Sequence, residues 1–254
     1  MKINIDGTEM NYICEGQGEN VLIMHGWGAN IPAMMPVHNI LKNDFKVYTV
    51  DFPGFGESPQ PPEAWGVYEY ADYMKKFIDE MKMDKVILIG HSFGGRISLI
   101  LSSKYPELVD RMVLIDAAGL IPKRGPKYYF KVYSFKALKK IYNSAFFWID
   151  RDERMKSFYT KFGSQDYKDA DPMMRKILVK VVNEDLRPLL KDIKASTLLI
   201  WGRNDTATPV YMAEIMEKEI KDSGLVVLED AGHFSYIDQY AQFSAVMKSF
   251  FKIN

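Results

Sequence analysis

Residues 86–95 read VILIGHSFGG, an apolar run that leads directly into a Gly-x-Ser-x-Gly motif, and a helical pattern follows over residues 93–105. In this setting the serine sits in a strained turn between a strand and a helix, and the small flanking residues let the two elements approach closely. The bare motif is a weak signal, since it arises by chance in roughly one chain in ten of this length. The flanking strand and helix make Ser92 the candidate nucleophile.

Strands and helices alternate on both sides of this stretch. Short apolar runs of the kind buried in parallel sheets lie at residues 21–24, 47–50, 86–89, 112–115, 198–201 and 225–228. Further helical patterns lie at residues 68–81, 211–220 and 236–251. Near the N-terminus, alternating apolar residues around Asp6-Gly7 predict an antiparallel hairpin. The alternation predicts an α/β fold.

A long insertion interrupts this rhythm between the strand ending near Ile115 and the strand starting near Leu198. About eighty residues separate them, far more than one crossover helix requires. Residues 128–148 are rich in aromatic side chains, and residues 173–182 form a second amphipathic pattern. We expect residues 119–189 to form a helical cap, or lid, packed on a core of residues 1–118 and 190–254.

A serine hydroxyl needs a base to accept its proton and a carboxylate to orient that base. In this architecture the chain order is nucleophile, acid, base, and His233 is the only histidine after Ser92. Two aspartates compete for the acid: Asp116 follows the apolar run at 112–115, and Asp205 follows the run at 198–201. Asp205 is favoured, because it follows the penultimate strand and leaves room for one helix and one strand before His233.

Hydrolysis also needs hydrogen-bond donors for the developing oxyanion. The sequence HGWG at 25–28 follows the first buried run, and its glycines let backbone N–H groups turn into the cleft. We assign the two donors to the amides of Trp27 and of Phe93, the residue after the nucleophile. The candidate walls of the substrate pocket are the side chains of Trp27, Phe130, Tyr133 and Phe234.

Five ordered motifs together resemble the α/β-hydrolase fold superfamily. They are HGWG at 25–28, DFPGFGES at 51–58, GHSFGG at 90–95, GRND at 202–205 and GH at 232–233. The resemblance covers roughly residues 1–118 and 190–254, and implies an eight-stranded, mostly parallel sheet with helices on both faces and a lid after the sixth strand. It also implies a Ser92, Asp205 and His233 triad. From this triad we expect a serine hydrolase that cleaves a carboxylic ester through an acyl-enzyme.

Two other functions stay open at this point. A carbon–carbon bond hydrolase of the meta-cleavage type would use a similar triad, but members of that group tend to carry tryptophan after the histidine, where Phe234 stands here. A ligand-binding or receptor-like protein would keep the fold and the pocket without turnover.

The composition narrows the remaining classes. Lys+Arg and Asp+Glu both number 33, so no basic field favours nucleic acid. The single cysteine, Cys14, excludes an internal disulfide and a multi-cysteine zinc site. No metal or nucleotide motif is present, so we expect chemistry without a metal or a cofactor, acting on a small-molecule ester.

Location and partners follow from the apolar and charged segments. No apolar stretch suits a signal peptide or a transmembrane helix, which predicts a cytoplasmic protein. A monomer and a homodimer are equally compatible with the sequence. Residues 117–149 carry seven Lys or Arg residues and no acidic residue, so the cap is a candidate for peripheral membrane contact.

Overall fold

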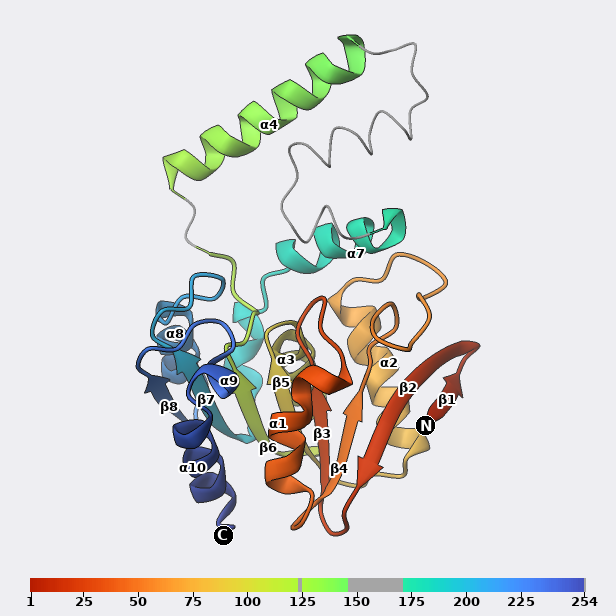
Figure 1. Cartoon of the computed structure of the whole chain (residues 1–254), viewed down its shortest axis with the longest axis vertical. Coiled ribbons are helices and arrows are strands. Elements are labelled where there is room, and N and C mark those ends of the chain that lie inside the picture. The colour runs from red at the N-terminus through yellow and green to blue at the C-terminus, as the bar shows by residue number, and fades with distance from the viewer. Residues whose placement is uncertain (123–124, 146–170, 254) are drawn as a thin grey trace. The chain divides into compact units, whose positions relative to one another are not determined.

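The computed structural model describes residues 1–122, 125–145 and 171–253. Eight strands form one sheet in the order β1-β2-β4-β3-β5-β6-β7-β8 (Figure 1). β1 (Lys2–Ile5) and β2 (Thr8–Glu15) form the expected antiparallel hairpin, and both residues of its Asp6-Gly7 turn have positive φ angles, 50° and 82°. β2 also pairs antiparallel with β4, and the remaining pairs are parallel.

The six parallel strands coincide with the six apolar runs of the sequence. Their bounds are β3 (Asn20–Met24), β4 (Lys46–Val50), β5 (Val86–His91), β6 (Val109–Ile115), β7 (Ser196–Gly202) and β8 (Ser223–Leu228). The expected eight-stranded, mostly parallel α/β fold is therefore confirmed.

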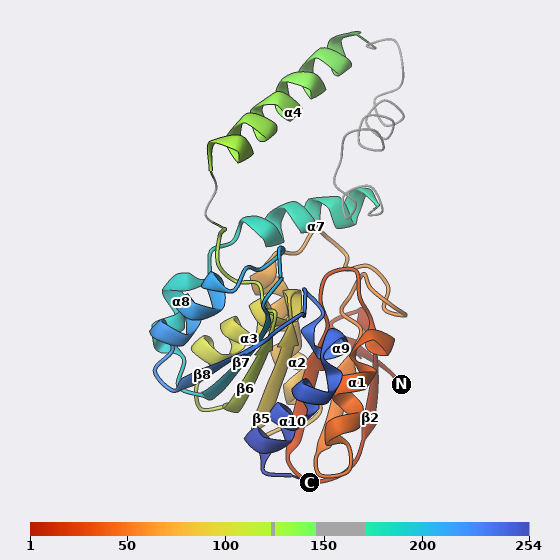
Figure 2. The same ribbon diagram turned by 60° about the vertical axis from the view of Figure 1, so that its left-hand side comes forward.

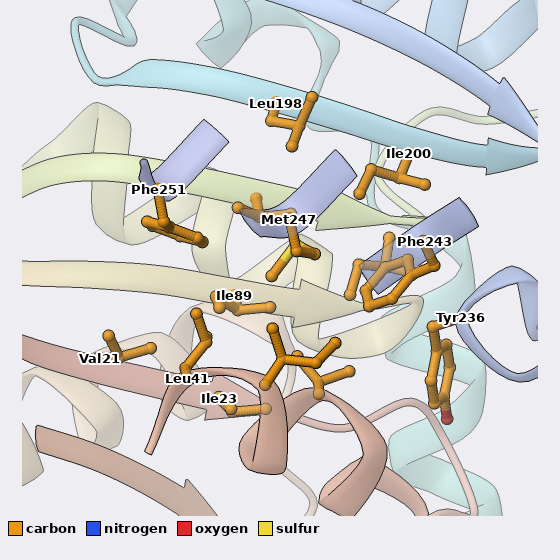
Figure 3. Close-up of a cluster of buried hydrophobic side chains, with 14 of the residues drawn as sticks. Val21, Ile23, Leu41, Ile89, Leu198, Ile200, Tyr236, Phe243, Met247 and Phe251 are labelled. Carbon is orange, nitrogen blue, oxygen red and sulfur yellow. The ribbon is translucent and has the colours of Figure 1, made fainter. Parts of the chain in front are cut away.

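Helices cover both faces of this sheet (Figure 2). One face carries α1 (Ile31–Leu41), α9 (Ser235–Asp238) and α10 (Tyr240–Phe251), and the other carries α2 (Val67–Glu80), α3 (Phe93–Lys104), the 3₁₀ helix η1 (Arg187–Asp192) and α8 (Tyr211–Glu219). On the first face, Phe243, Met247 and Phe251 of α10 pack over apolar residues of the sheet (Figure 3). Burial of these apolar side chains stabilises the sheet and so holds in place the strand ends that carry the site.

Two helical segments differ from the sequence-based expectations. α1 is absent from those expectations because Pro32 and Pro36 interrupt its pattern; Pro32 lies in the first turn, where no intrahelical N–H is needed, and Asn30 caps the helix. The helix expected over 236–251 is split into α9 and α10 at Gln239, whose φ and ψ are −125° and 49°. Asp238, at the end of α9, accepts the Gly232 N–H at 2.8 Å.

The chain forms two compact units. One comprises Met1–Ile121 and Lys180–Asn254 and holds the whole sheet; the other is Pro122–Val179 and holds α4 (Pro126–Ala145) and most of α7 (Pro172–Asn183). The second unit lies between β6 and β7 in the chain, where the insertion was expected, and its role as a cap stays a prediction. Within the described residues, no helix has both the length and the apolar character needed to cross a bilayer.

Candidate active site

Ser92 occupies a sharp bend between β5 and α3, with φ 48° and ψ −106°. This conformation, with a positive φ angle, is rare for a residue with a side chain and stores strain in the backbone. The two motif glycines allow the bend: a Cβ on Gly90 would lie 2.5 Å from the Gly94 carbonyl, and a Cβ on Gly94 would lie 2.2 Å from the Met24 carbonyl oxygen. The Ser92 hydroxyl therefore lies just after the end of β5, on a turn in which Gly90 and Gly94 pack closely against neighbouring backbone atoms.

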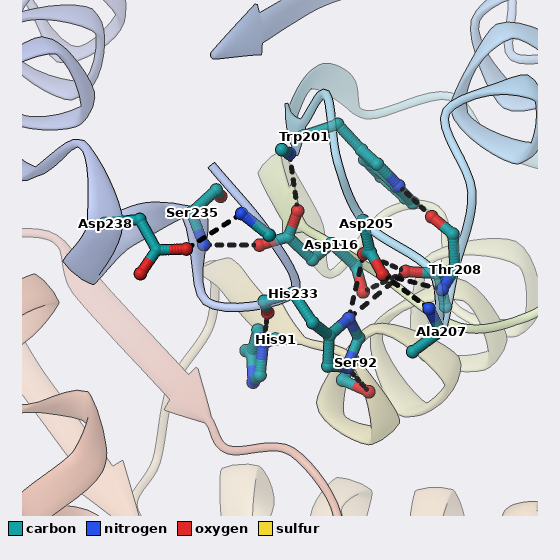
Figure 4. Close-up of polar contacts among 12 residues, drawn as sticks. His91, Ser92, Asp116, Trp201, Asp205, Ala207, Thr208, His233, Ser235 and Asp238 are labelled. Carbon is teal, nitrogen blue, oxygen red and sulfur yellow. Dashed lines mark hydrogen bonds and ion pairs between the residues drawn. The ribbon is translucent and has the colours of Figure 1, made fainter. Parts of the chain in front are cut away.

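Three side chains from different loops meet at this bend (Figure 4). His233, in the loop after β8, has its Nε2 2.9 Å from Ser92 Oγ and its Nδ1 2.8 Å from Oδ2 of Asp205, in the loop after β7. When Nδ1–H donates to the carboxylate, Nε2 has a free lone pair for the serine proton. The structure thus brings together the three residues that the sequence assigned to nucleophile, base and acid.

The Asp205 carboxylate is buried and fully engaged. Besides His233, Oδ2 accepts the Thr208 hydroxyl at 2.6 Å, and Oδ1 accepts the N–H groups of Ala207 and Thr208 at 2.8 and 2.9 Å. Burial alone would raise the pKa of Asp205, but the hydrogen bonds from His233 and Thr208 outweigh it and hold the pKa below 3.8. Asp205 is therefore an anion at neutral pH, as a partner for an imidazolium must be.

Asp116, the competing acid, is used differently. Its buried carboxylate accepts two backbone N–H groups, from Gly202 at 2.8 Å and from Ser235 at 3.0 Å. Burial raises the pKa of Asp116 to about 6, although these hydrogen bonds favour the ionised form. The structure therefore pairs Asp205 with His233 and pairs Asp116 with the backbone.

The loop that carries Trp27 is tied to the nucleophile turn. The Gly94 N–H donates to the His25 carbonyl oxygen at 3.0 Å, and the rings of Trp27 and Phe93 meet edge to face with centroids 5.8 Å apart. His25 itself is structural: Nδ1 donates to the Gly26 carbonyl oxygen at 2.7 Å, Nε2 accepts the Phe52 N–H at 3.1 Å, and burial lowers its pKa to about 4. The two segments assigned to the oxyanion hole thus lie side by side, and the role of their amides stays a prediction.

The residues expected to line the pocket lie in different units. The Phe234 ring, 46% exposed, neighbours the His233 ring at a centroid distance of 5.7 Å. Phe130 and Tyr133 belong to α4 and are 77% and 65% exposed. A shared pocket of these residues with Trp27 stays a prediction. Among the described residues, no three His, Cys, Asp or Glu side chains gather in a way that could hold a metal ion.

Two positioning contacts escaped the sequence analysis. Thr208 holds Asp205, and the spacing Asp-x-x-Thr was available as a signal, because such pairs form local side-chain turns. His91 donates from Nε2 to the His233 carbonyl oxygen at 2.8 Å. That contact joins residues 142 positions apart, so no local pattern could reveal it.

Comparison with known proteins identifies the family of this chain. A family model described as the alpha/beta hydrolase fold matches residues 19–240. The chain belongs to this family. The AB hydrolase superfamily protein YisY of Bacillus subtilis (strain 168) is 25% identical over 92% of each chain, and 2-hydroxy-6-oxo-6-phenylhexa-2,4-dienoate hydrolase of Burkholderia cepacia is 27% identical over 92% of this chain and 88% of its own.

Solved structures show the same fold. A membrane phospholipase A superposes with a TM-score of 0.78 at 22% identity, covering 99% of this chain and 85% of that one. At this identity the likeness shows the fold alone. The resemblance inferred from the five motifs is confirmed, and the protein is an alpha/beta hydrolase.

Proposed function

We propose that this alpha/beta hydrolase is a serine hydrolase that cleaves a small-molecule carboxylic ester through an acyl-enzyme. One observation carries the proposal: a continuous chain of contacts runs from Ser92 Oγ to His233 Nε2, at 2.9 Å, and from His233 Nδ1 to Asp205 Oδ2, at 2.8 Å. This arrangement supplies the base and the orienting carboxylate that a serine hydroxyl needs in order to attack a carbonyl.

The geometry supports a two-step reaction. Ser92 Oγ attacks the carbonyl carbon while His233 Nε2 takes its proton, and the buried Asp205 anion stabilises the imidazolium. The amides of Trp27 and Phe93 receive the oxyanion. His233 returns the proton to the departing alkoxide, which leaves an acyl group on Ser92.

Water completes the cycle. His233 takes a proton from a water molecule that attacks the acyl carbon, and then returns a proton to Ser92 Oγ as the carboxylic acid leaves. Each step uses only groups of the protein, the substrate and water.

A panel of p-nitrophenyl esters of increasing chain length tests the proposal. Ser92→Ala should lower kcat by up to about a millionfold, and Asp205→Asn by roughly ten thousandfold. Ser102→Ala is a matched control, because Ser102 is a buried serine further along the same helix. A fluorophosphonate should label the unaltered protein and Ser102→Ala but not Ser92→Ala; labelling that survives Ser92→Ala refutes the assignment.

A second candidate, carbon–carbon bond hydrolysis, is favoured by the name of the Burkholderia cepacia relative. The discriminating substrate is 2-hydroxy-6-oxo-6-phenylhexa-2,4-dienoate, whose cleavage by water releases benzoate and 2-hydroxypenta-2,4-dienoate and so removes the absorbance of the dienoate conjugated with the phenyl ketone. Turnover of this compound with no turnover of any ester would establish the second candidate. If neither substrate reacts while a small molecule raises the melting temperature, the protein is a ligand-binding member of the fold.

A further inference from the structure

Asp116 stands at the centre of the candidate site without touching the reacting atoms. It is the first residue after β6, and β6 lies between β5, which leads into Ser92, and β7, which leads into the Asp205 loop. Its φ angle is 45°, and its side chain has no exposed surface. A non-glycine residue in this conformation is uncommon and needs support from its surroundings.

The Asp116 carboxylate joins the last residue of β7 to the first residue of α9, which are far apart in the sequence. Oδ1 accepts the Gly202 N–H at 2.8 Å, and Oδ2 accepts the Ser235 N–H at 3.0 Å (Figure 4). Gly202 comes three residues before Asp205, and Ser235 comes two residues after His233. Each oxygen therefore holds the backbone beside one of the two residues that must stay paired.

The loop after β7 that carries Asp205, here called the acid loop, is closed by backbone hydrogen bonds, so a shift of Gly202 also shifts Asp205. The Asp205 N–H donates to the Gly202 carbonyl oxygen at 3.2 Å, and the Asn204 N–H donates to the Ala231 carbonyl oxygen at 2.8 Å. The backbone oxygen of Asp116 also lies 3.0 Å from the Thr208 hydroxyl, which contacts the Asp205 carboxylate. The acid loop is thus fastened to Asp116 on both sides of Asp205.

We propose that Asp116 is a positioning residue for the reaction at Ser92. Its carboxylate binds the backbone at Gly202, beside the loop that carries Asp205, and at Ser235, beside the loop that carries His233, and thereby sets the contact between Asp205 and His233. This inference rests on the proposed serine-hydrolase function. A displacement of about 1 Å in such a contact can cost on the order of a hundredfold in rate.

The chemistry of the contact explains why a carboxylate is required. Two N–H groups donate to Asp116, and a carboxylate presents one oxygen to each. Asparagine would offer one oxygen and would turn its NH₂ group toward the second donor. The titratable groups around Asp116 are Asp205 and His233, on the loops that it joins, and Tyr236, on α9; Asp205 disfavours an anion at Asp116, whereas the two N–H groups favour it.

The test compares Asp116→Asn and Asp116→Ser with Val113→Ala. Val113 lies on β6, three residues before Asp116, and is fully buried in the core, so its truncation destabilises the fold without touching either loop. All proteins are assayed with one p-nitrophenyl ester at pH 8, below their melting temperatures. The proton shared by His233 Nδ1 and Asp205 is followed by NMR and assigned by its loss in Asp205→Asn.

Asp116→Asn should lower kcat about tenfold or more, with KM changed less than about twofold, and should shift or remove the shared-proton signal. Asp116→Ser, which offers neither carboxylate oxygen, should have the larger effect and serves alone if Asp116→Asn does not fold. Val113→Ala should lower the melting temperature and leave kcat and the proton signal unchanged.

The inference is overturned if an Asp116 variant that folds has a kcat and a proton signal like those of Val113→Ala. Because the NMR measurement needs no substrate, it separates the two proposals. If no ester is turned over, the proposed function fails while the signal still tests Asp116; if esters are turned over and the Asp116 variants behave like Val113→Ala, only the role of Asp116 fails.

Discussion

His91 Nε2 donates a hydrogen bond to the backbone carbonyl oxygen of His233 at 2.8 Å, so the residue directly before the candidate nucleophile holds the candidate base. The His91 ring is buried, and burial lowers its pKa to about 3. The His91 imidazole is therefore uncharged at neutral pH, with its proton on Nε2. Within the described residues its Nδ1 atom has no hydrogen-bond partner, so the ring serves this one contact.

Replacing His91 by phenylalanine should keep the ring and remove the donor. The contacts with Phe234 and Tyr236, at centroid distances of 5.3 and 5.2 Å, can be kept by a phenyl ring. Loss of one hydrogen bond worth about 1 kcal/mol should lower kcat roughly threefold to tenfold. His38→Phe is the control, because it removes another buried imidazole, far along the chain on α1. An equal loss of kcat in both variants would contradict the role assigned to His91.

Thr208→Val should lower the free energy of unfolding more at neutral pH than at acidic pH. The Thr208 hydroxyl lies 2.6 Å from Asp205 Oδ2 and helps to hold the pKa of Asp205 below its usual value. A carboxylate with a lowered pKa stabilises the fold at neutral pH, and this contribution is lost as the pH falls through the pKa of the folded state. Valine should therefore lower the free energy of unfolding by about 2 kcal/mol at pH 7 and by less near pH 3.

Urea unfolding at the two pH values measures this difference. Thr208→Ser keeps the hydroxyl and should stay close to the unaltered protein at both. A stability loss in Thr208→Val that is the same at pH 7 and pH 3 would show that the hydroxyl does not act through the Asp205 anion.

Asp116 should have the opposite pH dependence. Its pKa is raised from 3.8 to about 6, so its contribution to stability is fully present below its unfolded value and is lost as the pH rises through about 6. At pH 7.5 the buried anion costs on the order of 3 kcal/mol compared with the protonated form. The stability advantage of the unaltered protein over Asp116→Asn should accordingly be larger at pH 4.5 than at pH 7.5. An advantage that does not change with pH would mean that Asp116 titrates as an ordinary exposed aspartate.

The sequence was sufficient for the features that depend on local patterns. Continuous apolar runs predicted the parallel strands, because a strand buried on both faces needs no polar alternation. The strand and helix around Ser92 identified the bend, chain order identified His233, and the position of Asp205 after the penultimate strand favoured it over Asp116. These residues follow apolar runs whose ends meet at the same edge of a parallel sheet.

Other features depend on contacts that no local pattern contains. The two prolines of α1 hide a helix that is formed by burial of Met34, Val37 and Leu41. The break at Gln239 lets Asp238 reach the loop before His233. Asp116 was recognised as a candidate acid, but its partners Gly202 and Ser235 lie 86 and 119 residues away. Such pairings become visible only when the sheet has been assembled.

Helix α4 presents apolar and cationic side chains to solvent. Phe130, Tyr133 and Ile141 are 77%, 65% and 63% exposed, and their spacing places them along one side of the helix. Lys136 and Lys140 are exposed beside them. A helix with exposed aromatic and aliphatic residues flanked by lysines suits the interface of an anionic bilayer, where the rings enter the headgroup region and the ammonium groups meet phosphates.

The double variant Lys136→Glu/Lys140→Glu should therefore bind vesicles of phosphatidylglycerol and phosphatidylcholine at least about tenfold more weakly than the unaltered protein, since each lysine near such a surface contributes roughly 1 kcal/mol. Lys218→Glu/Lys221→Glu makes the same change of charge at exposed positions on and just after α8, and should bind normally. Co-sedimentation at low salt measures both variants, and a vesicle of phosphatidylcholine alone separates apolar insertion from attraction to charge. Equally weakened vesicle binding in the two double variants would show that net charge, and not α4, governs the contact. Unaltered hydrolysis of a soluble ester by both variants would confirm that the substitutions leave the site around Ser92 intact.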